Sequence, residues 1–134
     1  LKFLKNGRKK NLIVLGSGKK VQPEEVEQYL EPSHLFKDVC ILGLPPLDPL
    51  RTGQEEVGCM VIPTDDHLEL FSDEKTLKIA LENEVRLRCK VVADYKRPTY
   101  IIVYMGEMPM TTTKKIKRSE VRLLAEKLRR KNDA

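Results

Sequence analysis

The chain has no tryptophan, only 5% of its 134 residues are aromatic, and it has no window of 18 consecutive apolar residues. Stacking of bases on aromatic side chains is therefore not expected to dominate recognition. The lack of a long apolar run excludes a membrane-spanning helix, and the first residues do not have the pattern of a signal peptide. We predict a soluble cytoplasmic domain, with at most a peripheral contact to a membrane.

Cysteine is also scarce. The three cysteines, Cys40, Cys59 and Cys89, are isolated and odd in number. No two of them have the spacing of a zinc site or of a redox pair. We expect three buried thiols that act as small apolar residues in a reducing compartment, and we expect this domain to bind no metal.

The charge is positive and unevenly distributed. Charged residues make up 34% of the chain, and the net charge is +5. Lysine and arginine crowd both ends, which admits nucleotides, coenzymes, nucleic acids or a membrane surface as partners without choosing among them. The length corresponds to one domain. Because the chain begins at Leu1, we expect residues 1–134 to be a single domain of a longer protein.

Apolar periodicity and turn residues predict a small α+β fold. Residues 1–4 and 11–16 should form a short N-terminal hairpin around a turn at Asn6 and Gly7. Further strands are expected at 38–45, 56–63 and 99–105, and helices at 23–30, at 73–92 and from about 119 onward. We predict a two-layer sandwich, with two or three helices packed on a three-stranded, mainly antiparallel sheet. The buried stripe of the helix at 73–92 should comprise Leu77, Leu81, Val85 and Cys89 at a spacing of four, widened by Ile79, Ala80 and Val92.

The stretch MPMTTTKKIKR, residues 108–118, has neither a helical nor a strand pattern. Its threonines compete with regular structure by bonding nearby backbone. Four cations follow them, directly before the last predicted helix. We expect an exposed loop, in which the cations are either a solvated run of charge or a means of delivering one ammonium group to an anion.

Two stretches together carry a family resemblance. Residues 7–27 are GRKKNLIVLGSGKKVQPEEVE, and residues 95–118 are YKRPTYIIVYMGEMPMTTTKKIKR. In order and content they resemble the C-terminal lid domain of the acyl-adenylate-forming AMP-dependent synthetases and ligases, a superfamily that includes acyl-CoA synthetases and luciferases. The resemblance covers nearly the whole chain. The glycine loop is one residue longer than in synthetases for short acids, which is more similar to the long-chain fatty-acid–CoA ligases.

The family's motifs fall on individual residues of this chain. The matching positions are Gly7, Arg8, Lys10, Asn11, Leu12, Ile13, Gly18, Pro23, Glu25, Val26 and Glu27 in the first stretch, and Pro109, Thr111, Lys115, Ile116 and Arg118 in the second. Two positions depart from the pattern: the glycine before the terminal lysine is Lys114 here, and an upstream lysine is Met110. We interpret Glu25 and Glu27 as charges at the start of a helix.

The resemblance implies a role for four residues. Lys115 would be catalytic, because its ammonium would stabilise the negative charge that develops when a carboxylate attacks the α-phosphate of ATP. Arg8 would bind the nucleotide, Lys10 would be the hinge in a segment spanning residues 1–10, and Gly18 would line the channel for the pantetheine of coenzyme A. We expect Lys115 to be exposed and to lie on the same side of the domain as Arg8 and the glycine loop.

The predicted function is the mobile lid of an ATP-dependent acyl-CoA synthetase. Its partners would be an N-terminal adenylation domain of the same chain, ATP, Mg²⁺, coenzyme A and a carboxylic acid, and the isolated domain should be inactive. Two alternatives stay open: an enzyme that loads the phosphopantetheine of a carrier protein, and a small basic nucleic-acid-binding module, for which no recognition motif is present. Whether Lys114 shares the role of Lys115 is also open.

Overall fold

The computed structural model describes residues 11–46, 50, 54–71 and 73–133. The predicted strand at residues 1–4 and the predicted hinge segment, residues 1–10, lie outside the described residues.

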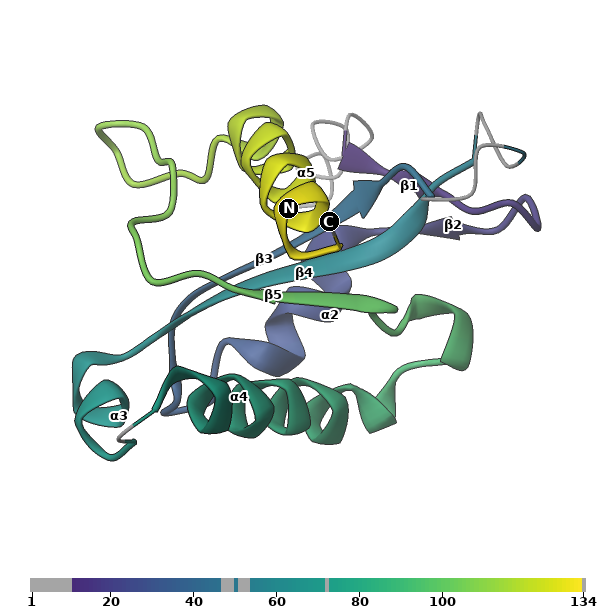
Figure 1. The fold of residues 1–134 in the computed structure, drawn as a ribbon. Helices are drawn as coiled ribbons and strands as arrows, with labels where there is room; N and C mark the ends of the chain where they lie inside the picture. Colours follow the sequence, from purple (N-terminus) through teal and green to yellow (C-terminus); the bar gives the residue numbers. More distant parts are fainter. Residues whose placement is uncertain (1–10, 47–49, 51–53, 72, 134) are drawn as a thin grey trace.

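A three-stranded sheet forms the centre of the domain (Figure 1). Its strands, in spatial order, are β3 (Phe36–Leu44), β4 (Glu56–Pro63) and β5 (Tyr100–Val103). β3 and β4 pair antiparallel, whereas β4 and β5 pair parallel. The predicted α+β class with three main strands is confirmed. The sheet is mixed because the chain crosses from β4 to β5 through a helix, as a parallel pair requires.

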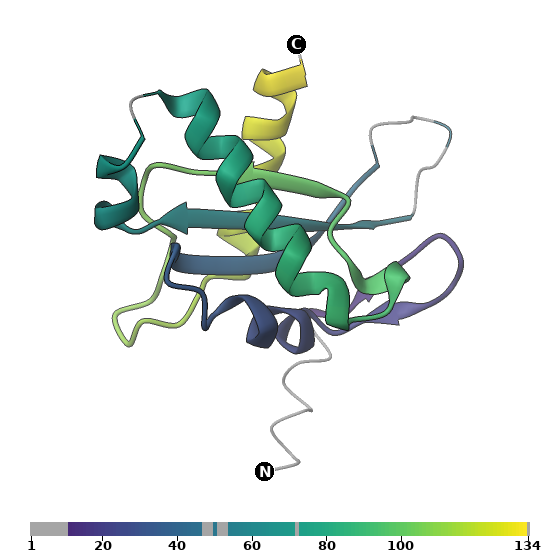
Figure 2. The ribbon, with the colours of Figure 1, turned by 90° about the horizontal axis from the view of Figure 1, so that it is seen from below.

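Helices cover both faces of the sheet (Figures 1 and 2). α2 (Pro23–Leu30) and α4 (Glu74–Arg88) lie on one face, and α5 (Arg118–Asp133) lies on the other. Alternate strand residues enter two cores: Ile41 and Val61 face α2 and α4, whereas Cys40 and Met60 face α5. The domain therefore has three layers rather than the predicted two, because both faces of β3 and β4 are apolar.

The helices begin close to where the sequence predicts. Pro23 occupies the first turn of α2, where its fixed φ is favourable. Asp73 caps α4 by accepting a hydrogen bond from the Thr76 amide at 2.9 Å. The stripe of α4 is confirmed at Leu77, Leu81 and Val85, and Cys89 is buried in the following turn, η3 (Cys89–Val91).

Ile79 is an exception to the predicted stripe, since it is 51% exposed. It lies two residues from both Leu77 and Leu81, and residues at that spacing do not share a helix face. Two short helical elements also fall outside the predicted ones. They are α3 (Asp65–Glu69), capped by the Thr64 hydroxyl, and η4 (Asp94–Lys96).

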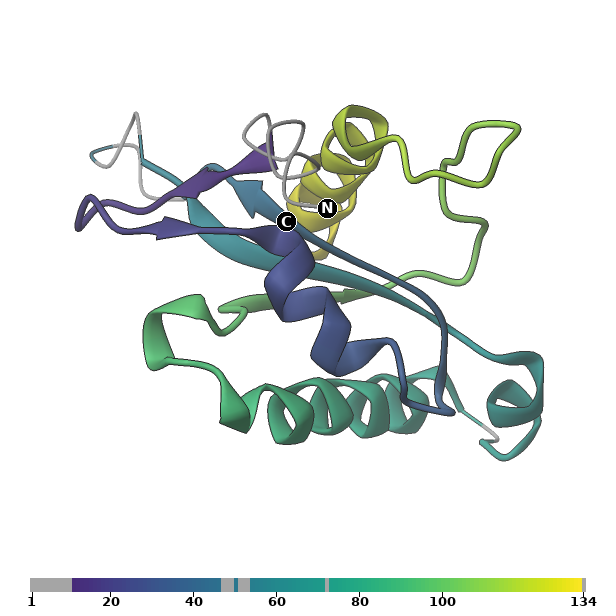
Figure 3. The same ribbon diagram turned by 180° about the vertical axis from the view of Figure 1, so that it is seen from behind.

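The glycine loop closes a small hairpin (Figure 3). β1 (Ile13–Val14) pairs antiparallel with β2 (Lys20–Val21), and the Leu15 amide donates to the Lys19 carbonyl at 2.9 Å. An N-terminal hairpin is thus present, but residues 20–21, which were not predicted as a strand, supply its second half.

The three cysteines are free and buried, as predicted. Burial raises the pKa of the Cys40 thiol to about 12, so that it stays protonated. Among the described residues, none of the helices has both the length and the apolar character that crossing a bilayer requires.

Candidate functional site

The lysine-bearing stretch is a short β-hairpin. Met110 and Ile116 form an antiparallel bridge. The Thr111 amide donates to the Lys115 carbonyl at 2.8 Å, and the Lys115 amide donates to the Thr111 hydroxyl at 3.1 Å. The stretch is exposed, as predicted, but it is more regular than expected because a threonine hydroxyl bonds across the turn. We call residues 109–117 the lysine hairpin.

Apolar residues fix the base of the lysine hairpin. Met108 is buried in the core beneath α5, and Met110 and Ile116 pack against the same core. The tip, residues 111–115, is exposed. Lys115 is therefore carried on an accessible tip whose base is anchored.

Lys114 has a left-handed backbone, with φ of +64°, the one such non-glycine residue in the part of the chain that the structure describes. Three-residue hairpin turns ordinarily end on a left-handed residue, most often glycine. The family that the sequence resembles has glycine at this position. Lys114 therefore replaces a glycine where the backbone is left-handed, a conformation that disfavours residues with a side chain.

Lys114→Gly is expected to raise the free energy of unfolding of the chain by up to about 1 kcal/mol. A left-handed L-residue costs roughly 1–2 kcal/mol, and the greater freedom of glycine in the unfolded state offsets about 0.5–1 kcal/mol of that. Urea unfolding measures the difference. Lys115→Gly, at a position without positive φ, is the matched control and should lower stability. Equal destabilisation by both variants would mean that the left-handed backbone of Lys114 is not strained.

The two neighbouring lysines differ in their surroundings. Lys114 lies close enough to Asp38 to oppose the rise in the pKa of Asp38 that burial produces. No residue that the structure describes forms an ion pair with Lys115. Lys114 and Lys115 are both exposed, and neither forms an ion pair with a described residue, so both charges are available to an anionic ligand.

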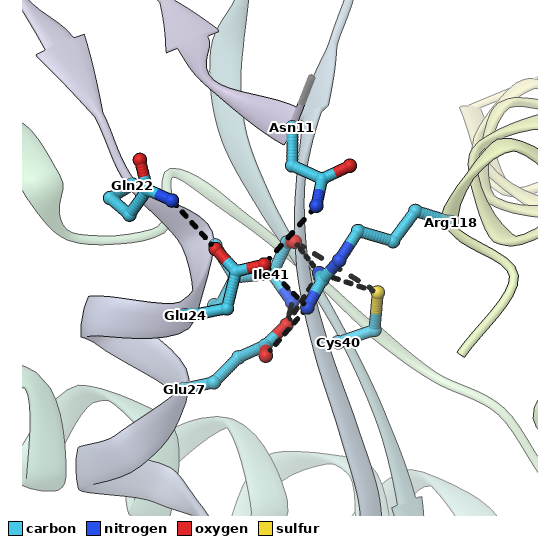
Figure 4. Close-up of polar contacts among 7 residues, drawn as sticks. All are labelled: Asn11, Gln22, Glu24, Glu27, Cys40, Ile41 and Arg118. Atoms are coloured by element: carbon cyan, nitrogen blue, oxygen red, sulfur yellow. Dashed lines mark hydrogen bonds and ion pairs between the residues drawn. The ribbon is translucent and has the colours of Figure 1, made fainter. Parts of the chain in front are cut away.

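A buried ion pair lies at the start of α5 (Figure 4). The Arg118 guanidinium donates to both carboxylate oxygens of Glu27, at 2.7 and 2.9 Å. Arg118 Nη1 also donates to the Ile41 carbonyl at 2.9 Å, and the Ile41 amide donates to Glu27 at 2.7 Å. The side chains are 19% and 5% exposed. This pair ties α5, α2 and β3 together, and its fork geometry is specific to arginine.

A second carboxylate extends the pair toward the N-terminal segment. Glu24 Oε2 lies 3.6 Å from Arg118 Nη2 and accepts a hydrogen bond from Asn11 Nδ2 at 3.1 Å. Its other oxygen accepts from Gln22 Nε2 at 3.1 Å. Asn11 directly follows the predicted hinge residue, Lys10, so the network reaches the described residue nearest to that position (Figure 4).

Burial raises the pKa of Glu27 above its ordinary value, against the opposing effect of the Arg118 guanidinium and the Ile41 amide. Burial alone would lower the pKa of Arg118, but the hydrogen bonds and charge of Glu27 outweigh it and raise that pKa. The guanidinium is therefore permanently charged, and the carboxylate is its main counter-ion.

The role of Glu27 differs from the one that the sequence suggested. It was interpreted as a charge at the start of a helix, yet it is buried together with Val26 and Leu30. A spacing of three between Glu27 and Leu30 places the carboxylate on the apolar stripe of α2, and this pattern could have indicated a buried acid that needs a partner. Glu25, by contrast, forms a surface ion pair with Lys96 at 2.8 Å.

We call the hairpin of β1 and β2, residues 13–21, the glycine hairpin. Gly18, in its turn, has free space beside it. Its φ is +90°, and a Cβ built there would meet no atom within 4 Å. The following residue, Lys19, places its ammonium 4.5 Å from the centre of the Tyr95 ring, which holds the loop against η4. Gly18 thus lies beside free space at the edge of the domain.

The structure does not bring all the predicted site residues together. The lysine hairpin and the glycine hairpin lie at opposite ends of the domain in both side views (Figures 1 and 3). The expectation that Lys115 lies on the same side as the glycine loop is therefore wrong. The reason is topological: the two hairpins flank the sheet at different ends of its strands. Arg8 and Lys10 lie outside the described residues.

A cleft of about 550 Å³ lies beside the buried ion pair, lined in part by Asn11, Ile116, Arg118 and Arg122. Arg122 is paired with Glu55 at 2.8 Å and with Glu126 at 3.1 Å. Both arginines are thus neutralised, which leaves the cleft a poor site for an anion. Within the described ranges, no three His, Cys, Asp or Glu side chains are placed to hold a metal ion.

The chain is similar to curated acyl-CoA synthetases, although no known family profile matches it. It is 30% identical over 122 residues to the mitochondrial medium-chain acyl-CoA ligase ACSF2 of Danio rerio, and 32% identical over 110 residues to the mitochondrial acyl-coenzyme A synthetase ACSM1 of Homo sapiens. These matches cover 90% and 82% of this chain. The chain spans 17% of the length of each relative.

Solved structures share the fold. The adenylation domain of a carboxylate reductase from Mycobacterium chelonae has a TM-score of 0.76 at 20% identity, over 95% of this chain and 20% of that one. The anthranilate CoA ligase AuaEII, in complex with anthranoyl-AMP, has a TM-score of 0.64 at 25% identity, over 87% and 20%. The fold is therefore one that occurs in adenylate-forming enzymes. The curated relatives are acyl-CoA synthetases.

Proposed function

We propose that this chain is the mobile C-terminal domain of an ATP-dependent acyl-CoA synthetase. The observation that carries the proposal is Lys115. It occupies the register of the family's terminal lysine, its side chain is exposed on an anchored hairpin, and no described carboxylate neutralises it. The names of the relatives, which are acyl-CoA synthetases, support the same class of reaction.

In the first half-reaction, a carboxylate oxygen of the acid attacks the α-phosphorus of ATP. The bond from that phosphorus to the bridging oxygen of pyrophosphate breaks, and an acyl adenylate forms. Negative charge builds up on the reacting oxygens, and the Lys115 ammonium would stabilise it. Arg8 would bind the nucleotide through the several donors of its guanidinium.

In the second half-reaction, the sulfur of coenzyme A, having lost its proton, attacks the acyl carbon and AMP leaves. Gly18 would line the path of the thiol, since any side chain there would project into the open space beside it. The two hairpins lie at opposite ends of the domain, so one orientation cannot bring both to one reaction centre. The domain would turn between the half-reactions, with Lys10 absorbing the change in backbone angles.

The remaining components would be held mainly by an N-terminal adenylation domain. Mg²⁺ would accompany ATP on that domain, since the described residues of this chain offer no group of three ligands for it. We propose a fatty or aryl carboxylic acid as substrate, in line with the medium-chain and anthranilate ligases among the similar proteins. Long-chain specificity and a cytoplasmic location remain predictions.

The test uses the longer protein that contains this chain, supplied with ATP, Mg²⁺ and a panel of fatty and aryl acids. We expect carboxylate-dependent exchange of pyrophosphate into ATP, and a CoA thioester detectable by mass spectrometry. The 134-residue chain alone should catalyse neither. Absence of exchange with every acid would refute the proposal. Transfer only to a carrier-protein phosphopantetheine would favour that alternative acceptor.

Gly18→Leu is expected to slow thioester formation from a preformed acyl adenylate by at least about 10-fold, while pyrophosphate exchange stays near the wild-type rate. Obstruction of the thiol path removes binding energy from this step alone. Gly18→Ala is the matched control, because it shares the strain of a positive φ but adds little volume. If Ala and Leu slow the step equally, strain rather than obstruction is responsible.

A further inference from the structure

Arg118 is more firmly held than its place after a run of exposed lysines suggests. Its guanidinium makes two short bonds to Glu27 and one to the Ile41 carbonyl, and it lies 3.6 Å from Glu24 (Figure 4). Such bidentate, charge-assisted bonds fix both distance and direction. The side chain therefore joins the start of α5 to β3 and α2 in one geometry.

The same residue is the first one after the lysine hairpin. The Lys117 amide donates to the Pro109 carbonyl at 3.0 Å and closes the hairpin base, and the Val121 amide donates to the Lys117 carbonyl at 3.0 Å in the first turn of α5. Only Ile116 and Lys117 separate Lys115 from Arg118 along the chain. Through its bonds to Glu27 and Ile41, Arg118 is therefore an anchor of the second strand of the hairpin, in addition to the packing of Ile116 against the core.

We propose that Arg118 is a positioning residue for Lys115, which clamps the second strand of the lysine hairpin to β3 and α2 through Glu27 and the Ile41 carbonyl. The proposal rests on the proposed function of Lys115. Arg118 itself does not touch the substrate; it fixes where the Lys115 ammonium is presented. Displacement of a reacting group by about 1 Å can lower a rate by 10²-fold, so a loosened clamp should reduce adenylation specifically.

The chain contains a matched control for this role. Arg129, on the same helix, also bonds one carboxylate, Glu56 at 2.8 Å, and one backbone carbonyl, that of Pro45 at 3.0 Å. It is 6% exposed, so it is at least as buried as Arg118. It lies near the other end of α5, away from the lysine hairpin. Replacing the Arg129 guanidinium therefore measures what a buried arginine of α5 contributes to stability, while the contacts of the lysine hairpin stay unchanged.

The experiment compares Arg118→Lys and Arg129→Lys in the longer protein. Both lose the planar fork but keep a positive charge. Arg118→Lys should lower the rate of pyrophosphate exchange by about 10–100-fold, with transfer from preformed acyl adenylate nearly unchanged. Arg129→Lys should leave the exchange rate close to that of the wild type, even where the two variants lose similar stability. Equal effects of both variants on exchange would overturn the proposal.

A double-mutant cycle tests whether Arg118 acts through Lys115. In a Lys115→Ala background, Arg118→Lys should cause no further loss of exchange, because residues that act as a unit are not additive. A full further loss would refute the positioning role.

Amide hydrogen–deuterium exchange of the 134-residue chain tests the clamp without any assay of enzymatic activity. Its result therefore does not depend on whether the proposed function is correct. Arg118→Lys, but not Arg129→Lys, should accelerate exchange at the Lys115 and Lys117 amides, and unchanged protection would refute the clamp whatever reaction the protein catalyses.

Discussion

Lys115→Ala is expected to lower carboxylate-dependent pyrophosphate exchange in the longer protein by about 10²–10³-fold, the loss measured when one well-placed donor is removed from a developing oxyanion. Transfer of the acyl group from preformed acyl adenylate to coenzyme A should change by no more than a factor of a few. The physical reason is that the hairpin tip can face only one reaction centre at a time, since it lies at the opposite end of the domain from the glycine hairpin.

The neighbouring lysine provides the control for this prediction. Lys114 is also exposed on the hairpin tip, but it lies one residue before the register of the family's terminal lysine. Lys114→Ala should reduce pyrophosphate exchange far less than Lys115→Ala does. Circular dichroism should show that both variants stay folded, because neither side chain is buried. Equal losses would mean that the two ammonium groups share the role, and equal loss of both half-reactions would assign Lys115 a structural role instead.

Much of the fold could be predicted from the sequence because its periodicities are simple. Leu77, Leu81 and Val85 recur every four residues and are buried in one helix, as predicted. The prediction of two layers missed a signal that the sequence does carry. The apolar runs of β3 and β4 are continuous rather than alternating, which indicates strands that are buried on both faces. The runs do not indicate which helix covers the second face, because that depends on where α5 returns after β5.

The candidate site was accessible from the sequence only where a motif marked it. The motif singled out Lys115, and the structure adds that this lysine stands on an anchored hairpin, while its catalytic role stays a prediction. The partnership of Glu27 with Arg118 was missed, because residues 91 positions apart carry no local pattern that links them. The separation of the two hairpins was also missed, since it follows from the strand order and not from any motif.

Glu27→Ala is expected to lower the free energy of unfolding of this chain by about 3 kcal/mol, near the lower end of the range for breaking a buried ion pair. The truncation leaves the Arg118 guanidinium without its main counter-ion and leaves the Ile41 amide, which now donates to Glu27 at 2.7 Å, without an acceptor. The loss is not larger because Glu24 stays 3.6 Å from Arg118. Since domains are stable by only about 5–15 kcal/mol, this is a large fraction.

Glu25→Ala in the same helix is the matched control for this measurement. Its ion pair with Lys96 has the same 2.8 Å separation, but the Glu25 side chain is 42% exposed, and such surface pairs contribute at most about 1 kcal/mol. Urea unfolding followed by circular dichroism should therefore separate the two variants by about 2 kcal/mol at a common slope. A difference close to zero would mean that the cost of burying Glu27 and Arg118 cancels their attraction, and that the pair fixes geometry without adding stability.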